Sequence, residues 1–484
     1  MLKKIFNLVK QSSIYGLGTI AVRAVSFILF PFYSHWMVPS EYAIMTLFLI
    51  MIGLLQPIYM HGLDIAYLRF SANAERDQQR RDLGTVLVHA LGFGILLSIP
   101  LLILAPQIAA LVVKGSGAKE IAMTRISIAI VLLDTLSFHI STFLRIRNKA
   151  ILFSLVKLGH VFLNIALNFL FVGYLHNGAL GVFQSFLWSS VGLLAVLLFA
   201  ARKEIHPGWS WMQIREWLIF GLPNVPSMIF YIFVEFSDRK LIELMMDKDS
   251  VGIYSAGYKI GMLMNMVAQA FRFAWQPFFL QTADDDDARE TFARVLTYFI
   301  AFAGMLWLLA TFFLEDILTI RLPKYGAIID IQYWDCMKVF PIIMLAHIFN
   351  GIYANFMVGI FLKKKTIMIP LIIGIAAVVN IVGNLLLIPK YGYLASAWLT
   401  VLAYFLMAAL TFLYINPKYP VPYEWRRIGR LALTLAAVWG VASVFSEYGA
   451  IWVKLFLTCG LICLWWFYVL MEDERLGIRR RLRK

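Results

Sequence analysis

Cysteine is scarce in this chain of 484 residues, which carries only Cys336, Cys459 and Cys463. Three cysteines are too few for a disulfide framework. Cys459 and Cys463 lie four positions apart in an apolar run, where we expect them to act as small packing residues. No group of cysteine and histidine residues has the spacing of a metal centre. The sequence therefore predicts neither a disulfide-stabilised domain nor a bound metal.

Motifs for the common enzymatic and nucleotide-dependent reactions are also missing. The chain has no G-x-x-x-x-G-K-[ST] loop for ATP, no H-E-x-x-H metalloprotease motif and no glycine-rich dinucleotide loop. The acidic run 284–287 has no accompanying ligand pattern, so it is better explained as a solvated loop than as a metal site. We therefore expect no cofactor and no catalytic residue, and predict that the chain is not an enzyme.

Charged residues are few, at 15% of the chain, whereas 61% of the residues are hydrophobic. A membrane helix needs roughly 20 mostly apolar residues, and continuous apolar runs favour helices over the short alternating strands of a membrane barrel. The chain is therefore predicted to be an all-α polytopic membrane protein. Its fourteen predicted transmembrane helices are 14–36, 42–64, 84–112, 121–144, 151–173, 179–200, 216–245, 251–279, 291–314, 335–361, 366–388, 393–415, 429–447 and 450–470.

The net charge of +15 is distributed unevenly between the two sides of the predicted membrane. With the N-terminus in the cytoplasm, 28 lysines and arginines fall on the cytoplasmic side and 6 on the outer side. This positive-inside bias places both termini in the cytoplasm. It also directs most of the basic residues to the headgroups of membrane lipids, and argues against nucleic acid as a partner.

The sequence contains an internal repeat. Asn164 and Asn168 in the fifth span have counterparts in Asn380 and Asn384 of the eleventh, and the starts of spans 1 and 2 resemble those of spans 7 and 8. Six spans per repeat give both halves the same orientation, with a substrate path predicted between them. We therefore expect two six-helix lobes in parallel repeat, at 1–214 and 215–416, followed by two C-terminal helices and a basic cytoplasmic tail at 417–484. The four asparagines are interpreted as structural polar pairs that bond between helices.

Four basic residues lie within predicted spans without an opposite charge three or four positions away. A charge near the middle of a bilayer is costly, at roughly 2.5–3.5 kcal/mol on the mildest scale, and therefore usually has a function. An internal ion pair or a side chain reaching to the interface is the alternative. Cations that line a cavity between the lobes would bind a phosphate or pyrophosphate. The predicted pyrophosphate-binding residues are Arg23, Lys157, Lys259 and Arg272.

Further charges in the spans are candidates for coupling or gating. Asp64 and Asp134 are candidates for cation or proton coupling, and Asp238 and Arg239 belong to a crowded group in the seventh span. Adjacent positions on a helix point in different directions, so we expect Asp238 and Arg239 to pair with neighbouring helices or headgroups rather than with each other. Prolines at 223, 226 and 277 are expected to bend spans 7 and 8.

Several motifs resemble those of the oligosaccharide flippases. They are the triplet Ser237-Asp238-Arg239, the stretch 251–260, the segment Gln276-Pro277-Phe278, and Asn380 and Asn384 followed by Pro389-Lys390-Tyr391-Gly392. With fourteen helices and a parallel repeat, the chain resembles a Wzx-type flippase of the multidrug/oligosaccharidyl-lipid/polysaccharide exporter superfamily.

The resemblance implies a function. The chain is expected to translocate an undecaprenyl-pyrophosphate-linked oligosaccharide across the bacterial inner membrane for O-antigen, capsule or exopolysaccharide synthesis. Its expected partners are this substrate, membrane lipids, and a polysaccharide polymerase with its chain-length machinery. Lipid II flippases of the superfamily carry cavity arginines on spans 1, 2 and 8; Arg23 and Arg272 match two of these, whereas span 2 has only Arg69 at its inner end.

Three alternatives stay open. A multidrug or cation antiporter of the same superfamily would be expected to have twelve spans and a carboxylate-rich cavity. A lipid II flippase would carry the missing arginine of span 2. A membrane-embedded glycosyltransferase or polymerase would need a large polar loop with catalytic carboxylates, and the loops of this chain are short.

Overall fold

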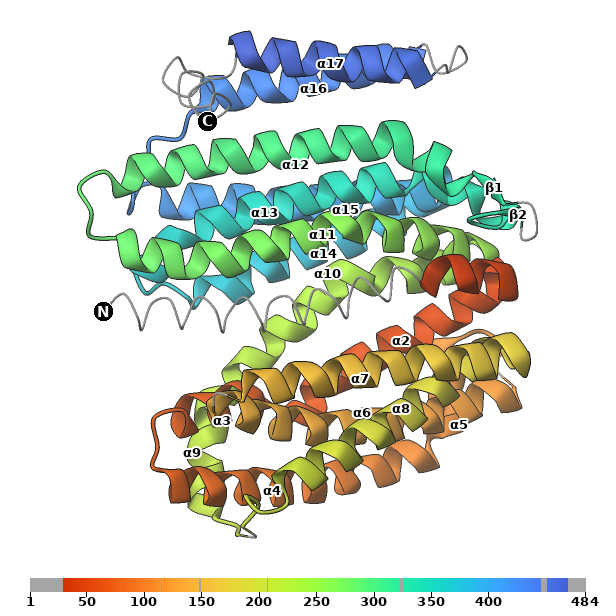
Figure 1. Ribbon diagram of the computed structural model, residues 1–484, viewed down its shortest axis with the longest axis vertical. Coiled ribbons are helices and arrows are strands. Elements are labelled where there is room, and N and C mark those ends of the chain that lie inside the picture. The colour runs from red at the N-terminus through yellow and green to blue at the C-terminus, as the bar shows by residue number, and fades with distance from the viewer. Residues whose placement is uncertain are drawn as a thin grey trace. The chain divides into compact units, whose positions relative to one another are not determined.

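The computed structural model describes residues 29–115, 117–147, 149–206, 208–322, 326–444 and 451–468, and these are almost entirely helical (Figure 1). The short strands β1 (Arg321–Leu322) and β2 (Gly326–Ala327) form an antiparallel hairpin. In a bilayer interior the backbone bonds only to itself, so long apolar runs become helices. Arg23 lies outside the described residues, as does most of the first predicted span, of which residues 29–36 are helical.

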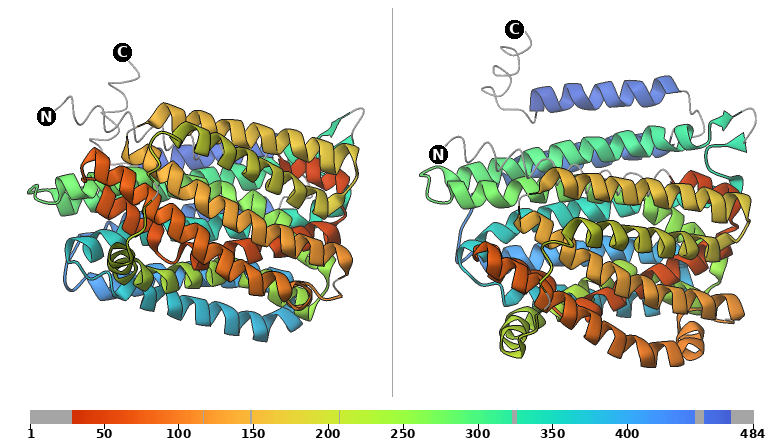
Figure 2. Two further views of the ribbon diagram at one scale, coloured as in Figure 1. Left: turned by 90° about the horizontal axis from the view of Figure 1, so that it is seen from below. Right: turned by 60° about the horizontal axis from the view of Figure 1, so that its bottom comes forward.

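The first half of the chain forms a bundle whose helices lie side by side in Figures 1 and 2. Its core joins Tyr67, Phe143 and Leu197, which come from three different helices, and Trp217 of the following segment packs with them. The elements up to the end of this bundle are α2 (Pro39–Met60), α3 (Leu63–Ser71), α4 (Arg76–Ile103), α5 (Ala105–Val112), α6 (Ala118–Ile146), α7 (Ala150–Asn168), the π-helix η1 (Phe169–Tyr174) and α8 (Gly178–Ala201).

A sharp corner separates α2 from α3. Pro39 starts α2, where a proline needs no backbone partner. The helix ends at His61 and Gly62, which adopt left-handed φ angles of 35° and 82°. A Cβ on Gly62 would lie 2.2 Å from the carbonyl carbon of Gly221, so only glycine allows the two backbones to meet here.

The second half begins with a broken helix. It comprises α9 (Trp211–Gly221), the 3-10 turn η2 (Leu222–Asn224) and α10 (Val225–Met245), and the break at Pro223 confirms the bend predicted for span 7. The helix α11 continues past residue 277 as one element. The remaining elements are α11 (Lys248–Thr282), α12 (Ala288–Leu318), η3 (Ile331–Lys338), α13 (Phe340–Leu362), α14 (Met368–Tyr391), α15 (Tyr393–Ile415), α16 (Trp425–Val444) and α17 (Ile451–Tyr468).

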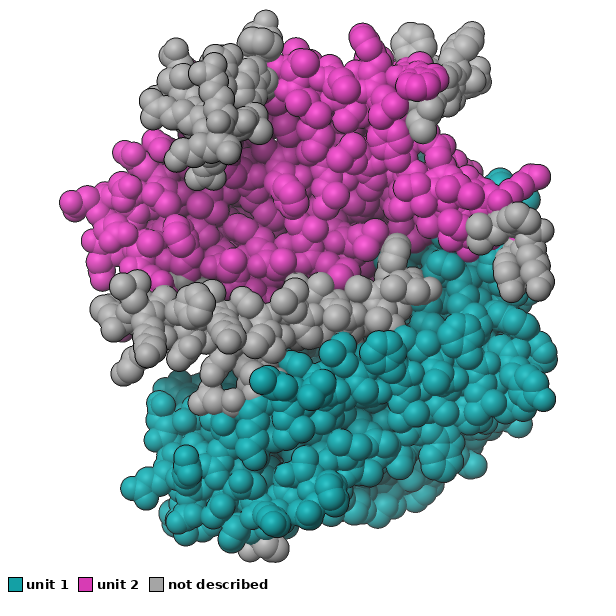
Figure 3. Space-filling model, in the orientation of Figure 1, with its two compact units in different colours: residues 1–259, 329–336, 369–399 teal, residues 260–328, 337–368, 400–484 magenta. Residues whose placement is uncertain are grey.

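The chain divides into two compact units, which Figure 3 shows in different colours. Unit 1 contains residues 1–259, 329–336 and 369–399, and unit 2 contains 260–328, 337–368 and 400–484. In unit 2, Leu308 and Phe312 of α12 pack with Leu435 and Val438 of α16 and with Leu461 of α17. The lobe boundaries at residues 214 and 416 stay a prediction.

Nine helices of the described residues are long and apolar enough to cross a membrane, or up to ten if α9 and α10 form one broken span. Large apolar side chains such as Leu96, Ile103 and Leu111 are exposed by 70% or more, as expected for helices that face lipid. The chain is therefore a multi-pass membrane protein. The predicted count of fourteen is not confirmed. Most of the first predicted span lies outside the described residues, and α11, α16 and α17 do not reach the required length or apolar character.

Candidate functional site

Lys157, on α7, faces a carboxylate that sequence spacing did not reveal. It interacts electrostatically with Asp134 of α6 and with His160, one turn further along its own helix. Asp134 in turn accepts a hydrogen bond of 2.7 Å from the Ser190 hydroxyl of α8. The side chains of three helices thus form a polar group inside the first bundle, in which Asp134 compensates part of the positive charge of Lys157.

Lys259 and Arg272 both lie on α11 and have no carboxylate partner among the described residues. Arg272 donates a hydrogen bond of 3.0 Å from Nη2 to the side-chain oxygen of Asn350 on α13. An amide orients the guanidinium without neutralising it, so the charge and the remaining donors of Arg272 stay available for an anion.

The spacing of these two cations bears on how an anion is held. Thirteen residues of α-helix correspond to about 20 Å of rise and about 220° of rotation. A single diphosphate is much shorter than this distance. Lys259 and Arg272 are therefore suited to successive contacts along a path rather than to one shared anion site, and their role in substrate binding stays a prediction.

Asp238 and Arg239 form a buried ion pair on α10, contrary to the expectation that they would not pair with each other. Arg239 Nη1 lies 2.9 Å from Asp238 Oδ1, and both side chains are at least 97% buried. The long arginine side chain turns back along the helix, where its Nη1 also donates to the Glu235 carbonyl oxygen. The Tyr254 hydroxyl of α11 donates to Asp238, and the Tyr258 ring lies 3.9 Å from the guanidinium carbon. The pair thereby joins α10 to the first turns of α11.

A second ion pair lies at the end of α10. Lys240 Nζ is 2.5 Å from Glu243 Oε2 and donates to the Val112 carbonyl oxygen at the end of α5. Glu243 also accepts a 2.7 Å bond from the Lys114 backbone amide. Lys240 and Glu243 are thus bonded to each other and to backbone groups, and these bonds attach α10 to the first bundle.

The two asparagine pairs have the same local geometry. Asn168 Nδ2 donates to the Asn164 carbonyl oxygen at 2.8 Å, and Asn384 Nδ2 donates to the Asn380 carbonyl oxygen at 2.9 Å. The surroundings differ: the Tyr33 hydroxyl donates to Asn168, whereas Asn380 accepts a 3.5 Å contact from Ser237. Each pair bonds to another helix, as a structural role requires.

Asp64 is the second residue of α3, directly after the corner that ends α2. Its side chain is half-buried, and its Oδ1 is buried without a hydrogen-bond partner among the described residues. An unpaired carboxylate oxygen is unusual inside a membrane protein and often belongs to a proton or ion site. Its predicted role in coupling stays a prediction.

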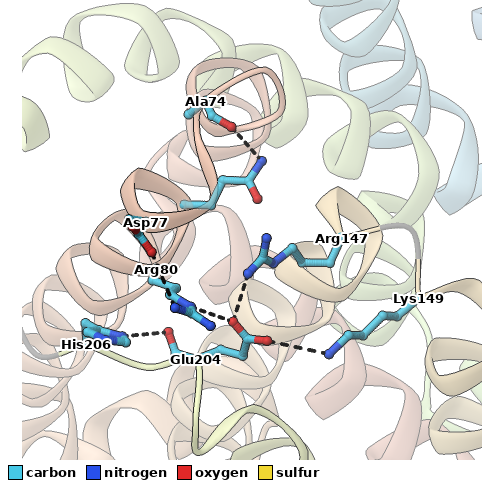
Figure 4. Close-up of polar contacts among 8 residues, drawn as sticks. Ala74, Asp77, Arg80, Arg147, Lys149, Glu204 and His206 are labelled. Carbon is cyan, nitrogen blue, oxygen red and sulfur yellow. Dashed lines mark hydrogen bonds and ion pairs between the residues drawn. The ribbon is translucent and has the colours of Figure 1, made fainter.

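Glu204, in the loop after α8, is a polar centre that sequence reasoning missed (Figure 4). Its carboxylate lies 2.8 Å from Arg80, 2.9 Å from Arg147 and 3.8 Å from Lys149. Hydrogen bonds from Arg80 and Arg147, together with their charges, lower the pKa of Glu204 to about 2. The sequence marks the three basic residues only as orientation signals. In the structure they link α4, the end of α6 and the loop before α7 to the loop after α8.

Comparisons with known proteins agree with this architecture. The family model of polysaccharide biosynthesis proteins matches residues 22–320. The structure of the lipid II flippase MurJ in its inward closed conformation is similar, with a TM-score of 0.71, 14% identity, and coverage of 93% of this chain and 98% of that chain. No curated protein matches the chain.

Multidrug transporters share the same fold. An inward-facing multidrug resistance MATE family transporter of the MOP superfamily has a TM-score of 0.67 and 15% identity, covering 86% of this chain and 96% of its own. The outward-facing conformation of a MATE family transporter has a TM-score of 0.55 and 18% identity, covering 88% and 96%. The predicted resemblance to this superfamily is confirmed. The matched structures are those of a flippase and of transporters, and they show the fold that this chain shares with them.

Proposed function

The chain belongs to the family of polysaccharide biosynthesis proteins, and from this premise we propose that it is a flippase for an undecaprenyl-pyrophosphate-linked oligosaccharide. It carries this substrate from the cytoplasmic to the outer leaflet of the bacterial inner membrane, with both of its own termini in the cytoplasm. The observation that carries the proposal is a polysaccharide-synthesis family match on a chain with the fold of a lipid flippase. A polysaccharide pathway needs its lipid-linked repeat units moved between leaflets.

The charges of α11 support a substrate with an anionic headgroup. Lys259 and Arg272 lack carboxylate partners among the described residues, and Arg272 is held by an amide. A cation in a membrane protein is retained at a cost of a few kcal/mol, which a pyrophosphate would offset during transport. In this proposal Arg23, Lys157, Lys259 and Arg272 contact the pyrophosphate in turn while the polyprenyl chain stays in the lipid.

A multidrug antiporter is the second candidate, since the MATE transporters have the same fold. Such a protein needs anionic side chains to bind a cationic drug. Asp134 is bonded to Ser190 and faces Lys157, and Asp238 is paired with Arg239. These carboxylates are therefore compensated within the protein, which favours the anionic substrate.

The proposal is tested by depleting the protein in cells that make a surface polysaccharide. Depletion is expected to cause lipid-linked oligosaccharide to accumulate in the inner leaflet, and the wild-type chain is expected to restore export. Lys259→Ala and Arg272→Ala should restore it at least tenfold less well at equal expression. Lys119→Ala removes an exposed lysine as the matched control and should restore export fully. Restored export by both α11 variants would reject the anion path, and export that is unchanged by depletion would reject the flippase function.

A further inference from the structure

Three histidines from three elements lie together in the first bundle, and the proposed function uses none of them. His61 ends α2, His89 lies in α4 and His139 lies in α6. The Nε2 atoms of His61 and His89 are 3.0 Å apart, and His139 interacts electrostatically with both rings. His61 and His89 are half-buried, whereas His139 is fully buried.

The tautomer of the pair follows from its hydrogen bonds. His61 Nδ1 lies 2.7 Å from the Tyr59 carbonyl oxygen, which only accepts, so His61 Nδ1 carries a proton. In the neutral ring, Nε2 of His61 is then an acceptor, and the 3.0 Å contact requires that His89 Nε2 donates to it. The open acceptor of the neutral pair is therefore Nδ1 of His89.

This arrangement distinguishes a first proton from a second. The first binds at His89 Nδ1 and strengthens the bond to His61, because the donor becomes charged. The second has only His61 Nε2 left to bind. It would place two N–H groups and two positive charges face to face, so the bond between the rings is lost.

His61 also holds the corner between α2 and α3. Its own φ angle of 35° is unfavourable for a residue other than glycine, and its Nδ1 bonds the carbonyl of Tyr59 in the last turn of α2. The backbone of the adjacent Gly62 packs closely against that of Gly221, at the end of α9. The bond between the rings thus fixes to α4 the same corner that contacts the end of α9, next to the break between α9 and α10.

The other titratable groups around the pair are few. His139 faces it from α6, and a neighbouring imidazole disfavours additional positive charge. Asp64 and Tyr67 follow on α3, where Asp64 retains an unpartnered oxygen and the Tyr67 ring lies 6.2 Å from that of His139. The contact from α9 is the backbone of Gly221, which does not titrate.

We infer that His61 and His89 form a proton-binding site whose second proton releases the α2–α3 corner from α4. The release is a property of the protein alone. Its use as the coupling step of transport rests on the proposed function, because coupling requires a transported substrate whose movement is linked to the binding of the proton.

The test measures the distance between α3 and α4 in the full chain, reconstituted in nanodiscs without substrate. Spin labels are placed at Ile65→Cys and Leu91→Cys, both exposed, with the exposed Cys459 and Cys463 changed to serine. Between pH 8 and pH 5 the wild type should gain a population of longer distances. Once the first proton is bound, the ratio of this population to the short-distance population should rise by up to about tenfold per pH unit, as expected for release by one further proton.

Two variants remove the titration by different means. His61→Asn places at the corner a residue that tolerates the left-handed conformation. His89→Gln substitutes a residue inside the regular helix α4 and leaves the corner unchanged. Both should give distances that do not depend on pH. His206→Gln removes an exposed histidine on the loop after α8 and should respond like the wild type. A wild type without a pH response, or a His89→Gln variant with the wild-type response, would overturn the proton site whatever the protein transports.

The coupling role has a separate test. In proteoliposomes with the lipid-linked oligosaccharide, an imposed pH gradient should change the transport rate of the wild type but not that of His89→Gln. Equal responses of the two proteins to the gradient would reject the coupling role. Absence of transport by the wild type would instead reject the proposed function and would leave the spin-label result as it stands.

Discussion

At the scale of single residues, the charges of this protein fall into two groups. One group has partners of opposite charge and comprises Asp238, Arg239, Lys240, Glu243 and Glu204. Lys259 and Arg272 form the other group, whose charge no described carboxylate compensates. A buried ion pair chiefly affects stability, because the removal of one partner leaves the charge of the other uncompensated. Unpaired cations offer binding energy to a ligand. The two groups therefore call for different experiments.

The ion pair between Asp238 and Arg239 gives the first prediction. Asp238→Asn should destabilise the protein by about 3–5 kcal/mol, because it leaves a buried guanidinium without its counter-charge. The measurement is the midpoint of thermal unfolding in detergent. Asp77→Asn makes the same chemical change in an exposed pair, 3.3 Å from Arg80, and should cost less than about 1 kcal/mol. Equal midpoints for the two variants would contradict a structural role of the buried pair.

Glu204 gives a prediction about pH. The pKa of its carboxyl falls from the ordinary value of 4.5 to about 2 in the folded protein, so the folded state favours the ionised form. This stabilisation is fully present above pH 4.5 and is lost as the pH falls towards 2.

The measurement compares the wild type with Glu204→Gln. At pH 7 the variant should be less stable by about 1 kcal/mol, since the group is partly exposed, and the difference should shrink below pH 4.5. Glu216→Gln, at an exposed position of α9, should match the wild type throughout. A gap between wild type and Glu204→Gln that stays constant from pH 7 to pH 3 would show that the carboxylate charge is not responsible.

At the scale of secondary-structure elements, α2 meets the second half of the chain at both of its ends through glycine. Gly221 contacts the end at Gly62, and Gly252 at the start of α11 contacts the end at Pro39. A Cβ on Gly252 would lie 1.9 Å from the Pro39 carbonyl oxygen, which is rigid backbone. Movement of the end of α9 or of the start of α11 against α2 must therefore open or close these two contacts.

A substitution at Gly252 tests this packing. Gly252→Ala should lower the unfolding midpoint, at a cost of about 1–3 kcal/mol, because α2 and α11 must separate to admit the methyl group. Gly53→Ala, in the middle of α2, has no atom within 4 Å of the added methyl and should be neutral or stabilising. If Gly252→Ala were as stable as Gly53→Ala, the close contact at the start of α11 would not be a feature of the folded protein.

At the scale of the whole molecule, sequence patterns predicted the helices well because apolar length is a local property. The predicted spans 179–200 and 393–415 correspond to α8 (Gly178–Ala201) and α15 (Tyr393–Ile415). The asparagine pairs were predictable for the same reason, since their members are four positions apart.

Contacts between distant segments were not predictable in this way. Glu204 meets Arg80 and Arg147 across 124 and 57 positions, and the bond between His61 and His89 spans 28. Nothing in the spacing of these residues marks them as neighbours, because tertiary packing decides which helix faces meet. The prediction that Asp238 and Arg239 would not pair with each other was wrong for another reason. The flexible arginine side chain reaches the carboxylate although the two Cβ atoms point in different directions.

The positive-inside distribution predicts the orientation of the entire chain, and it is testable with single cysteines. Lys119 is exposed at the start of α6, and Lys203 is exposed in the loop after α8. The proposed topology places these two positions on opposite sides of the membrane. Lys119→Cys should react with a membrane-impermeant maleimide in intact spheroplasts, whereas Lys203→Cys should react only after permeabilisation. Both variants are made in a protein whose exposed Cys459 and Cys463 are changed to serine, and this protein without a new cysteine provides the background, since Cys336 is buried. Labelling of Lys203→Cys in intact spheroplasts would show that the topology is the reverse of the one proposed. It would then also contradict the direction in which the proposed flippase carries its substrate.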